Sequence, residues 1–202
     1  MRSNADLRND AKSILRGKWG TAVVITLVTV IIQGMLTASQ DELPLLYLLL
    51  YTFLSLPLNF GITMTYLYLS RGGGFSVENM FSAFNSTYYI KSVVLGLLTT
   101  IYIFLWSMLL FVPGIIKAMS YFLAPYILAD NPSLSGEQAI CQSMKMMEGH
   151  KMDLFLMTLG CVGFVLLSAC LLLIPLLWVV PYYQTTFARF YDSVKAEYTP
   201  IQ

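Results

Sequence analysis

Long apolar segments alternate along this chain with short segments whose apolar residues recur at helical spacing. The clearest apolar segment, Ser92 to Val112, has no charged residue over 21 positions, and a helix needs about 20 residues to cross a membrane. The segments that we expect to span a membrane are Trp19 to Leu36, Leu45 to Ser70, Tyr88 to Val112, Ile115 to Ala129, Leu154 to Leu172 and Ile174 to Tyr191. The fourth is short, so we expect either that the Pro113-Gly114 turn before it lies below the outer surface or that the bilayer thins there.

Backbone polar groups in lipid need partners within the protein, and long Leu-rich segments without alternation favour helices over a β-barrel. The composition agrees, because 57% of the residues are hydrophobic and only 11% are charged. The sequence therefore predicts an all-α polytopic transmembrane helical bundle of about six spans, with residues 1–202 forming a single membrane domain.

The distribution of positive charge predicts the orientation. If the six segments cross the membrane in turn, eleven of the 12 Lys and Arg residues lie on the same side as the N-terminus, which is then the cytoplasm. Lys117 is the exception. We expect both termini to be cytoplasmic, and we expect the first span to be an anchor rather than a cleaved signal peptide. The eleven are Arg2, Arg8, Lys12, Arg16, Lys18, Arg71, Lys91, Lys145, Lys151, Arg189 and Lys195.

An internal repeat is predicted, because a short amphipathic segment precedes each odd-numbered span. Ser3 with Asp6, Ser76, and Ser135 with Gln138 are the expected N-terminal caps of these segments. We expect three helices that lie along the cytoplasmic interface, each followed by a helical hairpin. Glycines at Gly17 and Gly149 suit the ends of the first and third helices. The predicted repeats are residues 3–71, 76–131 and 135–195. The alternative is that the three segments are not true repeats and resemble one another only as the spans of any membrane protein with several spans do.

Several short motifs resemble the bacterial membrane proteins catalogued as the domain of unknown function 975 family. They are Gly17-Lys18-Trp19-Gly20, Trp106-Ser107, Val112-Pro113-Gly114-Ile115-Ile116-Lys117-Ala118, Ala124-Pro125-Tyr126-Ile127-Leu128-Ala129-Asp130-Asn131-Pro132, Met146-Met147, Gly149-His150-Lys151, and Pro181-Tyr182 with Phe190-Tyr191. The chain departs from the family pattern at Gly163-Phe164, and it lacks glycines between Leu171 and Ile174. The resemblance implies a protein of the bacterial inner membrane and carries no established activity with it.

Polar residues within the even-numbered spans are the first candidate site. Asn59, Lys117 and Gln184 each follow a proline and are expected near the bilayer midplane, with Thr185 beside them. A polar side chain in lipid is costly unless it faces the bundle interior, so these residues predict a polar centre between the even-numbered spans. The alternative is that the amides and hydroxyls join helices while Lys117 extends to the membrane surface.

The second candidate is an interfacial motif formed by Asp130, Asn131, His150 and Lys151. His150 has no nucleophile or second base near it in sequence, so we interpret it as an interfacial anchor. His, Cys and carboxylate residues are not clustered at metal-ligand spacing. No cofactor and no nucleic-acid partner are expected.

Two function classes remain open. We favour a non-catalytic membrane scaffold or assembly factor that uses its interfacial helices and a Met-rich surface at Met144, Met146 and Met147. The alternative is a transporter, or a protein that handles lipids or small molecules, with its site at the midplane polar centre. The expected partners are membrane lipids and either another membrane protein or a second copy of the chain.

Overall fold

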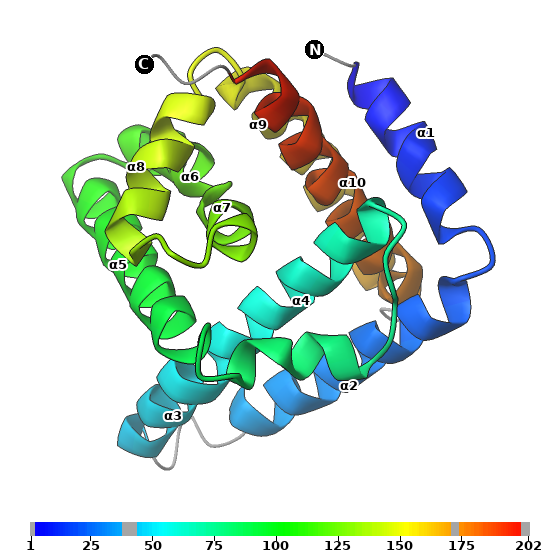
Figure 1. Cartoon of the computed structure of the whole chain (residues 1–202), viewed down its shortest axis with the longest axis horizontal. Helices are drawn as coiled ribbons and strands as arrows, with labels where there is room; N and C mark the ends of the chain where they lie inside the picture. The colour runs from blue at the N-terminus through cyan, green and yellow to red at the C-terminus, as the bar shows by residue number, and fades with distance from the viewer. Residues whose placement is uncertain (1–2, 38–43, 171–173, 199–202) are drawn as a thin grey trace.

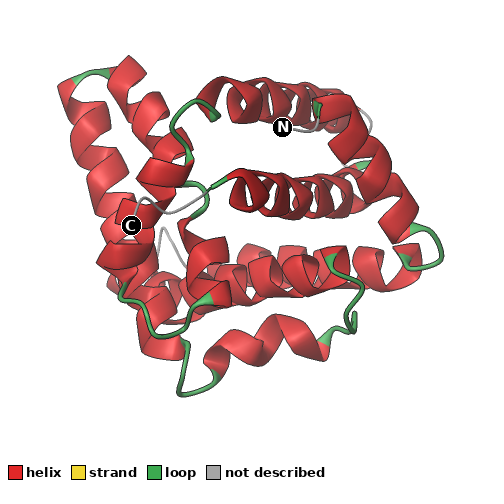
Figure 2. Cartoon of the chain, turned by 45° about the horizontal axis from the view of Figure 1, so that its top comes forward, coloured by secondary structure: helices red, strands yellow, loops and turns green. Residues whose placement is uncertain are grey.

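All elements of the described chain are helical, and the loops between them are short (Figures 1 and 2). The structure is a computed structural model, and it describes residues 3–37, 44–170 and 174–198. Arg2 and the end of the predicted fifth span lie outside these residues. The elements are α1 (Asn4–Leu15), α2 (Trp19–Thr37), α3 (Pro44–Leu50), the π-helical turn η1 (Tyr51–Ser55), α4 (Leu56–Ser70), the 3-10 helix η2 (Glu78–Phe84), α5 (Tyr89–Leu109), α6 (Phe111–Tyr121), α7 (Ala124–Asp130), α8 (Gly136–Met146), α9 (Lys151–Cys170) and α10 (Leu176–Glu197).

Five helical segments of the described chain are long and apolar enough to cross a membrane. They are Trp19–Thr37, Pro44–Ser70, Tyr89–Leu109, Phe111–Asp130 and Lys151–Ser168. The predicted sixth span, Ile174 to Tyr191, begins two residues before α10 and otherwise lies in this helix, which is not among the five. Its C-terminal half carries Arg189, Asp192 and Lys195, which are costly in lipid. The all-helical prediction is confirmed, and the membrane prediction is supported at the level of five helices.

The odd-numbered segments and the even-numbered segments differ in burial. About a fifth of the residues in the apolar windows of α2, α5 and α9 are buried within the protein, against 33% and 44% for the segments ending at Ser70 and Asp130. Large apolar side chains on α2, α5 and α9, the odd-numbered spans, are exposed, including Val30, Phe104 and Leu159. A soluble protein does not expose a continuous apolar surface of this kind, so these helices have the character of lipid-facing helices.

The helix ends that the sequence predicts for the first and third interfacial segments are confirmed. Ser3 with Asp6, and Ser135 with Gln138, form the two capping boxes that begin α1 and α8. Gly17 follows α1 at a φ of 80° and Gly149 follows α8 at a φ of 85°. A side chain with Cβ is strained at such angles, so glycine ends both segments cheaply.

The second interfacial segment is a 3-10 helix rather than the predicted amphipathic α-helix. Met80 and Ala83 are fully buried, three positions apart, whereas Phe81 is 43% exposed. A 3-10 helix has three residues per turn, so spacing of three defines its buried face. This face lies close to α4, because a Cβ at Gly61 would be only 2.0 Å from the carbonyl oxygen of Met80. Gly61 therefore permits backbone contact between η2 and α4.

The break between the third and fourth segments is at Leu110, not at Pro113-Gly114. Leu110 is extended, with φ at −158° and ψ at 138°, and α6 begins at Phe111. Pro113 thus occupies the first turn of a helix, where its missing N–H costs nothing. The segment Phe111–Asp130 has 20 residues, or about 30 Å of helix, so neither a sunken turn nor a thinned bilayer is required.

Each of the three predicted interfacial segments packs against an even-numbered span: for η2 and α8 it is the segment just before it in the sequence, and for α1 it is the last helix of the chain. α1 contacts α10, η2 contacts α4, and α8 contacts α7. The three odd-numbered spans contact the same even-numbered spans in turn: α2 contacts α10, α5 contacts α4, and α9 contacts α6. In Figure 1 α2, α5 and α9 accordingly lie around α4, α7 and α10.

Helix α8 does not expose the predicted Met-rich surface. Met146 and Met147 are 3% and 0% exposed and belong to the main hydrophobic core, and Met144 is half-buried beside it. The buried side of α8 instead packs against α5, α6 and α7.

Candidate functional site

Charged residues from three even-numbered segments meet in one group, which we call the ionic cluster. Arg71, at the C-terminal end of α4, donates two hydrogen bonds to the carboxylate of Asp130 at 2.6 and 2.9 Å. Its Nε and Nη2 also donate to Oδ1 of Asp192, on α10, at 3.0 and 2.7 Å. A single guanidinium therefore joins the ends of α4 and α7 to α10. The cluster consists of Ser70, Arg71, Asp130, Tyr191, Asp192 and Lys195.

The remaining members complete the hydrogen bonding of the two carboxylates. The hydroxyl of Tyr191 donates to Oδ2 of Asp130 at 2.8 Å, and Lys195 forms a further ion pair with the same oxygen. The hydroxyl of Ser70 lies 2.8 Å from the carbonyl oxygen of Leu67 and 3.2 Å from Oδ2 of Asp192, and its single proton serves one of the two acceptors at a time. Two cations and two carboxylates balance, and the side chain of Asp130 is only 10% exposed. The cluster is thus a neutral, hydrogen-bonded joint.

The electrostatics of the cluster favour its fully ionised form. The hydrogen bonds to Asp130 raise the pKa of Arg71 above its ordinary value, so the guanidinium stays charged. The hydroxyl of Tyr191 donates to Asp130, the hydroxyl of Ser70 has the Leu67 carbonyl and Asp192 as acceptors, and no Cys or His belongs to the cluster. This arrangement suits the joining of helices better than acid–base or nucleophilic chemistry.

The residues of the predicted midplane polar centre are not joined by hydrogen bonds or ion pairs in the part of the chain that the structure covers. Asn59 is exposed and Gln184 is half-buried. The ammonium of Lys117 lies over the ring of Trp106, 4.8 Å from its centroid. Thr185 is fully buried and donates its hydroxyl to the carbonyl of Pro181 at 2.9 Å, which is a bond within its own helix.

Only Asp130 of the predicted interfacial motif belongs to the ionic cluster. Asn131 is the C-terminal cap of α7 and lines a polar pocket of about 630 Å³ beside the cluster, together with Lys145, Lys195 and Tyr198. His150 Nε2 lies 3.8 Å from a carboxylate oxygen of Glu197. Lys151 lines an apolar cleft between α6 and α9.

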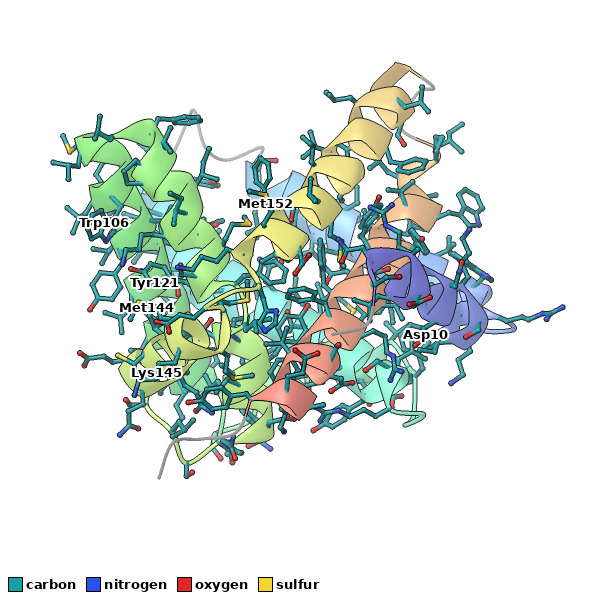
Figure 3. The ribbon with its side chains drawn as sticks, turned by 90° about the horizontal axis from the view of Figure 1, so that it is seen from above. Asp10, Trp106, Tyr121, Met144, Lys145 and Met152 are labelled. Carbon is teal, nitrogen blue, oxygen red and sulfur yellow. The ribbon has the colours of Figure 1, made fainter. Side chains whose placement is uncertain are left out.

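A metal centre is not suggested by the described residues, among which no three His, Cys, Asp or Glu side chains are grouped as ligands. In Figure 3 the α5–α6 hairpin with Trp106 and the helix α9 with Met152 diverge away from the level of Lys145 on α8. The ionic cluster joins α4, α7 and α10, whereas Lys117 and Trp106 lie together on the α5–α6 hairpin.

Comparison with known families identifies the family of the chain. A family model described as "Protein of unknown function (DUF975)" matches residues 1–120 and 108–198. The chain belongs to the DUF975 family. The match covers nearly the whole chain and confirms the resemblance seen in the sequence motifs. No curated protein and no solved structure matches the chain, so the family supplies no activity for this DUF975 protein.

Sequence reasoning missed most of the ionic cluster because it treated Arg71 and Lys195 only as markers of orientation. A signal was present. Arg71 and Asp130 each stand at the end of an even-numbered segment, and Asp192 stands directly after the third predicted one. Charges of opposite sign at corresponding helix ends are expected to meet if those ends converge. The convergence itself depends on packing between segments more than 50 residues apart.

Proposed function

We propose that this DUF975 protein is a non-catalytic scaffold or assembly factor of the bacterial cytoplasmic membrane. The observation that carries the proposal is the ionic cluster, in which every charge has a partner of opposite sign and the ends of α4 and α7 are held to α10. A transport or catalytic site keeps polar groups available for a substrate, whereas this cluster uses its polar groups on one another. An enzyme is accordingly the less supported class.

We further propose that the scaffold consists of three repeats, residues 3–71, 76–131 and 135–195. The order of helix contacts supports this division. Each interfacial helix packs on the even-numbered segment of the preceding repeat, and the first packs on α10 of the third, so the order closes on itself. Arg71 and Asp130 then come from the C-terminal ends of the even-numbered segments of the first two repeats, and Asp192 comes from the last turns of α10 in the third.

The proposed topology has six spans, with α10 as the sixth and both termini in the cytoplasm. The ionic cluster would lie at the cytoplasmic ends of the even-numbered helices, where its charges are near water. This position agrees with the distribution of Lys and Arg. The scaffold would present the exposed apolar surfaces of α2, α5 and α9 to membrane lipids and to either another membrane protein or a second copy of the chain.

The alternative, a transporter with a polar centre at the midplane, has less support. It requires Asn59, Lys117 and Gln184 to share a polar cavity, and hydrogen bonds do not connect them in the described structure. Lys117 instead lies over Trp106, a cation–π contact.

Cysteine accessibility tests the choice between scaffold and transporter. In a background without the three native cysteines, Lys117→Cys and Gln184→Cys are treated with a membrane-impermeant thiol reagent, in sealed cells and in inverted vesicles. A packed scaffold predicts no reaction at either position from either side. Reaction of both positions from both sides would overturn the scaffold and indicate an aqueous path.

Ser133→Cys is the matched control, because Ser133 is exposed in the connection between α7 and α8. The proposed topology predicts that it reacts in inverted vesicles and not in sealed cells. The opposite result would reverse the orientation while leaving the test of the core valid.

A further inference from the structure

A second hollow, which we call the basic groove, has a volume of about 810 Å³ and lies along α1 beside α9 and α10. One wall carries three cations and the other wall is aromatic. Asn4 holds the start of α1 to α9, because its amide donates to the carbonyl of Asp153 at 3.1 Å. The groove is lined by Ala5, Arg8, Asn9, Lys12, Arg16, Trp19, Phe164, Trp178, Val179, Tyr182 and Tyr183.

Helical geometry explains why the three cations form a row. Leu7, Ala11 and Leu15 are fully buried at i, i+4 and i+8 and fix the rotation of α1. Arg8, Lys12 and Arg16 each follow one position later and therefore form a parallel stripe. Like charges four residues apart on a helix repel one another weakly, and Lys12 and Arg16 are exposed, so the stripe is mildly unfavourable and a bound anion would relieve the repulsion.

No Asp or Glu lines the groove among the described residues. On α1 itself, Asp6 forms the capping box with Ser3, and Asp10 pairs with Arg189 at 3.0 Å. The three cations therefore face a hollow without a carboxylate, in contrast to the two cations of the ionic cluster.

Two buried polar atoms point to the same place. The Nε of Arg8 and the hydroxyl of Tyr183 are buried without a hydrogen-bond partner in the described structure, and Tyr183 is 2% exposed. A Cβ added at Gly160 would lie 2.6 Å from Nη2 of Arg8 and 3.2 Å from the hydroxyl of Tyr183. Gly160 thus leaves room for a guanidinium and a phenol to converge, and both are donors to an oxyanion.

The other wall fits a hydrocarbon chain. Phe164 and Trp178 are 50% and 47% exposed and contribute to the apolar surfaces of α9 and α10. Tyr182 continues this wall toward α1, where the ammonium of Lys12 lies 6.0 Å from its ring centroid. A ligand that fits both walls has an anionic end and an apolar end, which is the chemistry of a membrane lipid.

We propose that the basic groove binds an anionic phospholipid. Its phosphate is bound by Arg8, Lys12 and Arg16 with the hydroxyl of Tyr183, and an acyl chain lies along Phe164 and Trp178. The volume is of the size of a ligand pocket, up to about 1,000 Å³, and accommodates the head group with part of a chain. The site does not depend on the scaffold role, because it uses none of the residues of the ionic cluster.

The first experiment measures the unfolding temperature of the full-length protein in a neutral detergent during titration with one of three probes. The probes are dioleoylphosphatidylglycerol, dioleoylphosphatidylcholine and inorganic phosphate. The proposal predicts saturable stabilisation by phosphatidylglycerol alone. Equal stabilisation by phosphatidylcholine would overturn the requirement for an anionic lipid, and equal stabilisation by inorganic phosphate would show a phosphate site that needs no lipid.

Charge-removing variants locate the site. Lys12→Gln and Arg16→Gln are each expected to weaken apparent phosphatidylglycerol affinity about five-fold, since one basic residue near an anionic lipid contributes about 1 kcal/mol. Lys145→Gln is the matched control, because Lys145 is an exposed lysine in the last turn of α8, outside the groove. Equal weakening by Lys145→Gln would indicate nonspecific attraction and overturn the assignment.

A spectroscopic measurement on the intact groove avoids any variant that fails to fold there. Two of the three tryptophans, Trp19 and Trp178, line the groove, and Trp106→Phe removes the third. In this protein, phosphatidylglycerol brominated on its acyl chains should quench fluorescence at a lower mole fraction than brominated phosphatidylcholine. Identical quenching curves would mean that the groove does not select its lipid, and would overturn the proposal.

Discussion

The ionic cluster and the basic groove are built from the same kinds of side chain but are completed differently. In the cluster, Arg71 and Lys195 face two carboxylates, and Tyr191 donates to one of them. In the groove, three cations face no carboxylate, and the hydroxyl of Tyr183 is without a partner in the described structure. Helix α10 contributes to both sites.

The difference separates a joint from a binding site. A charge removed from water is tolerated when an opposite charge and hydrogen bonds compensate it, and the cluster meets this condition internally. Among the described residues the groove holds no carboxylate, but Lys12 and Arg16 are exposed, so water solvates them and the proposed lipid phosphate would be their anionic partner. Neutralising one member should therefore have opposite consequences at the two places. A substitution in the cluster should lower the free energy of unfolding, whereas a substitution in the groove should leave it unchanged when no lipid is bound.

The largest effect is expected for Asp130→Asn. Asp130 accepts from Arg71, Tyr191 and Lys195, so removing its charge leaves Arg71 with Asp192 as its carboxylate partner and removes the ion pair of Lys195. We expect the free energy of unfolding to fall by about 2–4 kcal/mol, somewhat less than for a fully buried ion pair because Arg71 is partly exposed. Chemical denaturation in detergent micelles, followed by tryptophan fluorescence, measures the change.

Glu148→Gln is the control for this variant, since Glu148 is an exposed carboxylate in the connection between α8 and α9. We expect it to leave the free energy of unfolding unchanged. If Asp130→Asn were no more destabilising than Glu148→Gln, the ionic cluster would not be a structural joint.

Lys117 offers an intermediate case, a cation whose partner is an aromatic ring. Its ammonium lies 4.8 Å from the ring centroid of Trp106. We expect Lys117→Met to lower the free energy of unfolding by about 0.5–1 kcal/mol, and Lys117→Arg to restore most of it. The same denaturation measurement applies. A loss as large as that of Asp130→Asn would show that Lys117 belongs to a polar centre after all.

The sequence predicted local features of the fold better than its long-range contacts. The ends of α1 and α8 follow from Ser3, Gly17, Ser135 and Gly149, because caps and positive-φ glycines act within a few residues of themselves. The 3-10 form of η2 was missed, since it depends on the approach of Met80 to Gly61 on a different segment. Periodicity alone favoured an α-helix there.

The long-range contacts of the candidate site were not predicted from the sequence either. Asp130 was recognised as a helix end, but its partners Arg71 and Tyr191 are about 60 residues away in either direction, with separations of 59 and 61. Asn59, Lys117 and Gln184 were grouped by their depth and by the proline that precedes each of them. Depth does not determine the rotation of a helix about its axis, and rotation decides which polar side chains meet.

The smallest effect is expected for Arg8→Met, and it distinguishes the two regions most directly. Met retains the apolar length of the side chain and removes a charge whose Nε has no hydrogen-bond partner in the described structure. It also relieves repulsion from Lys12, four positions on, so without lipid the free energy of unfolding should stay constant or rise by about 0.2–0.5 kcal/mol. Denaturation in lipid-free neutral detergent measures this, beside Asp130→Asn under the same conditions. A loss approaching that of Asp130→Asn would mean that Arg8 has a structural partner within the protein, and the two regions would then be joints of the same kind.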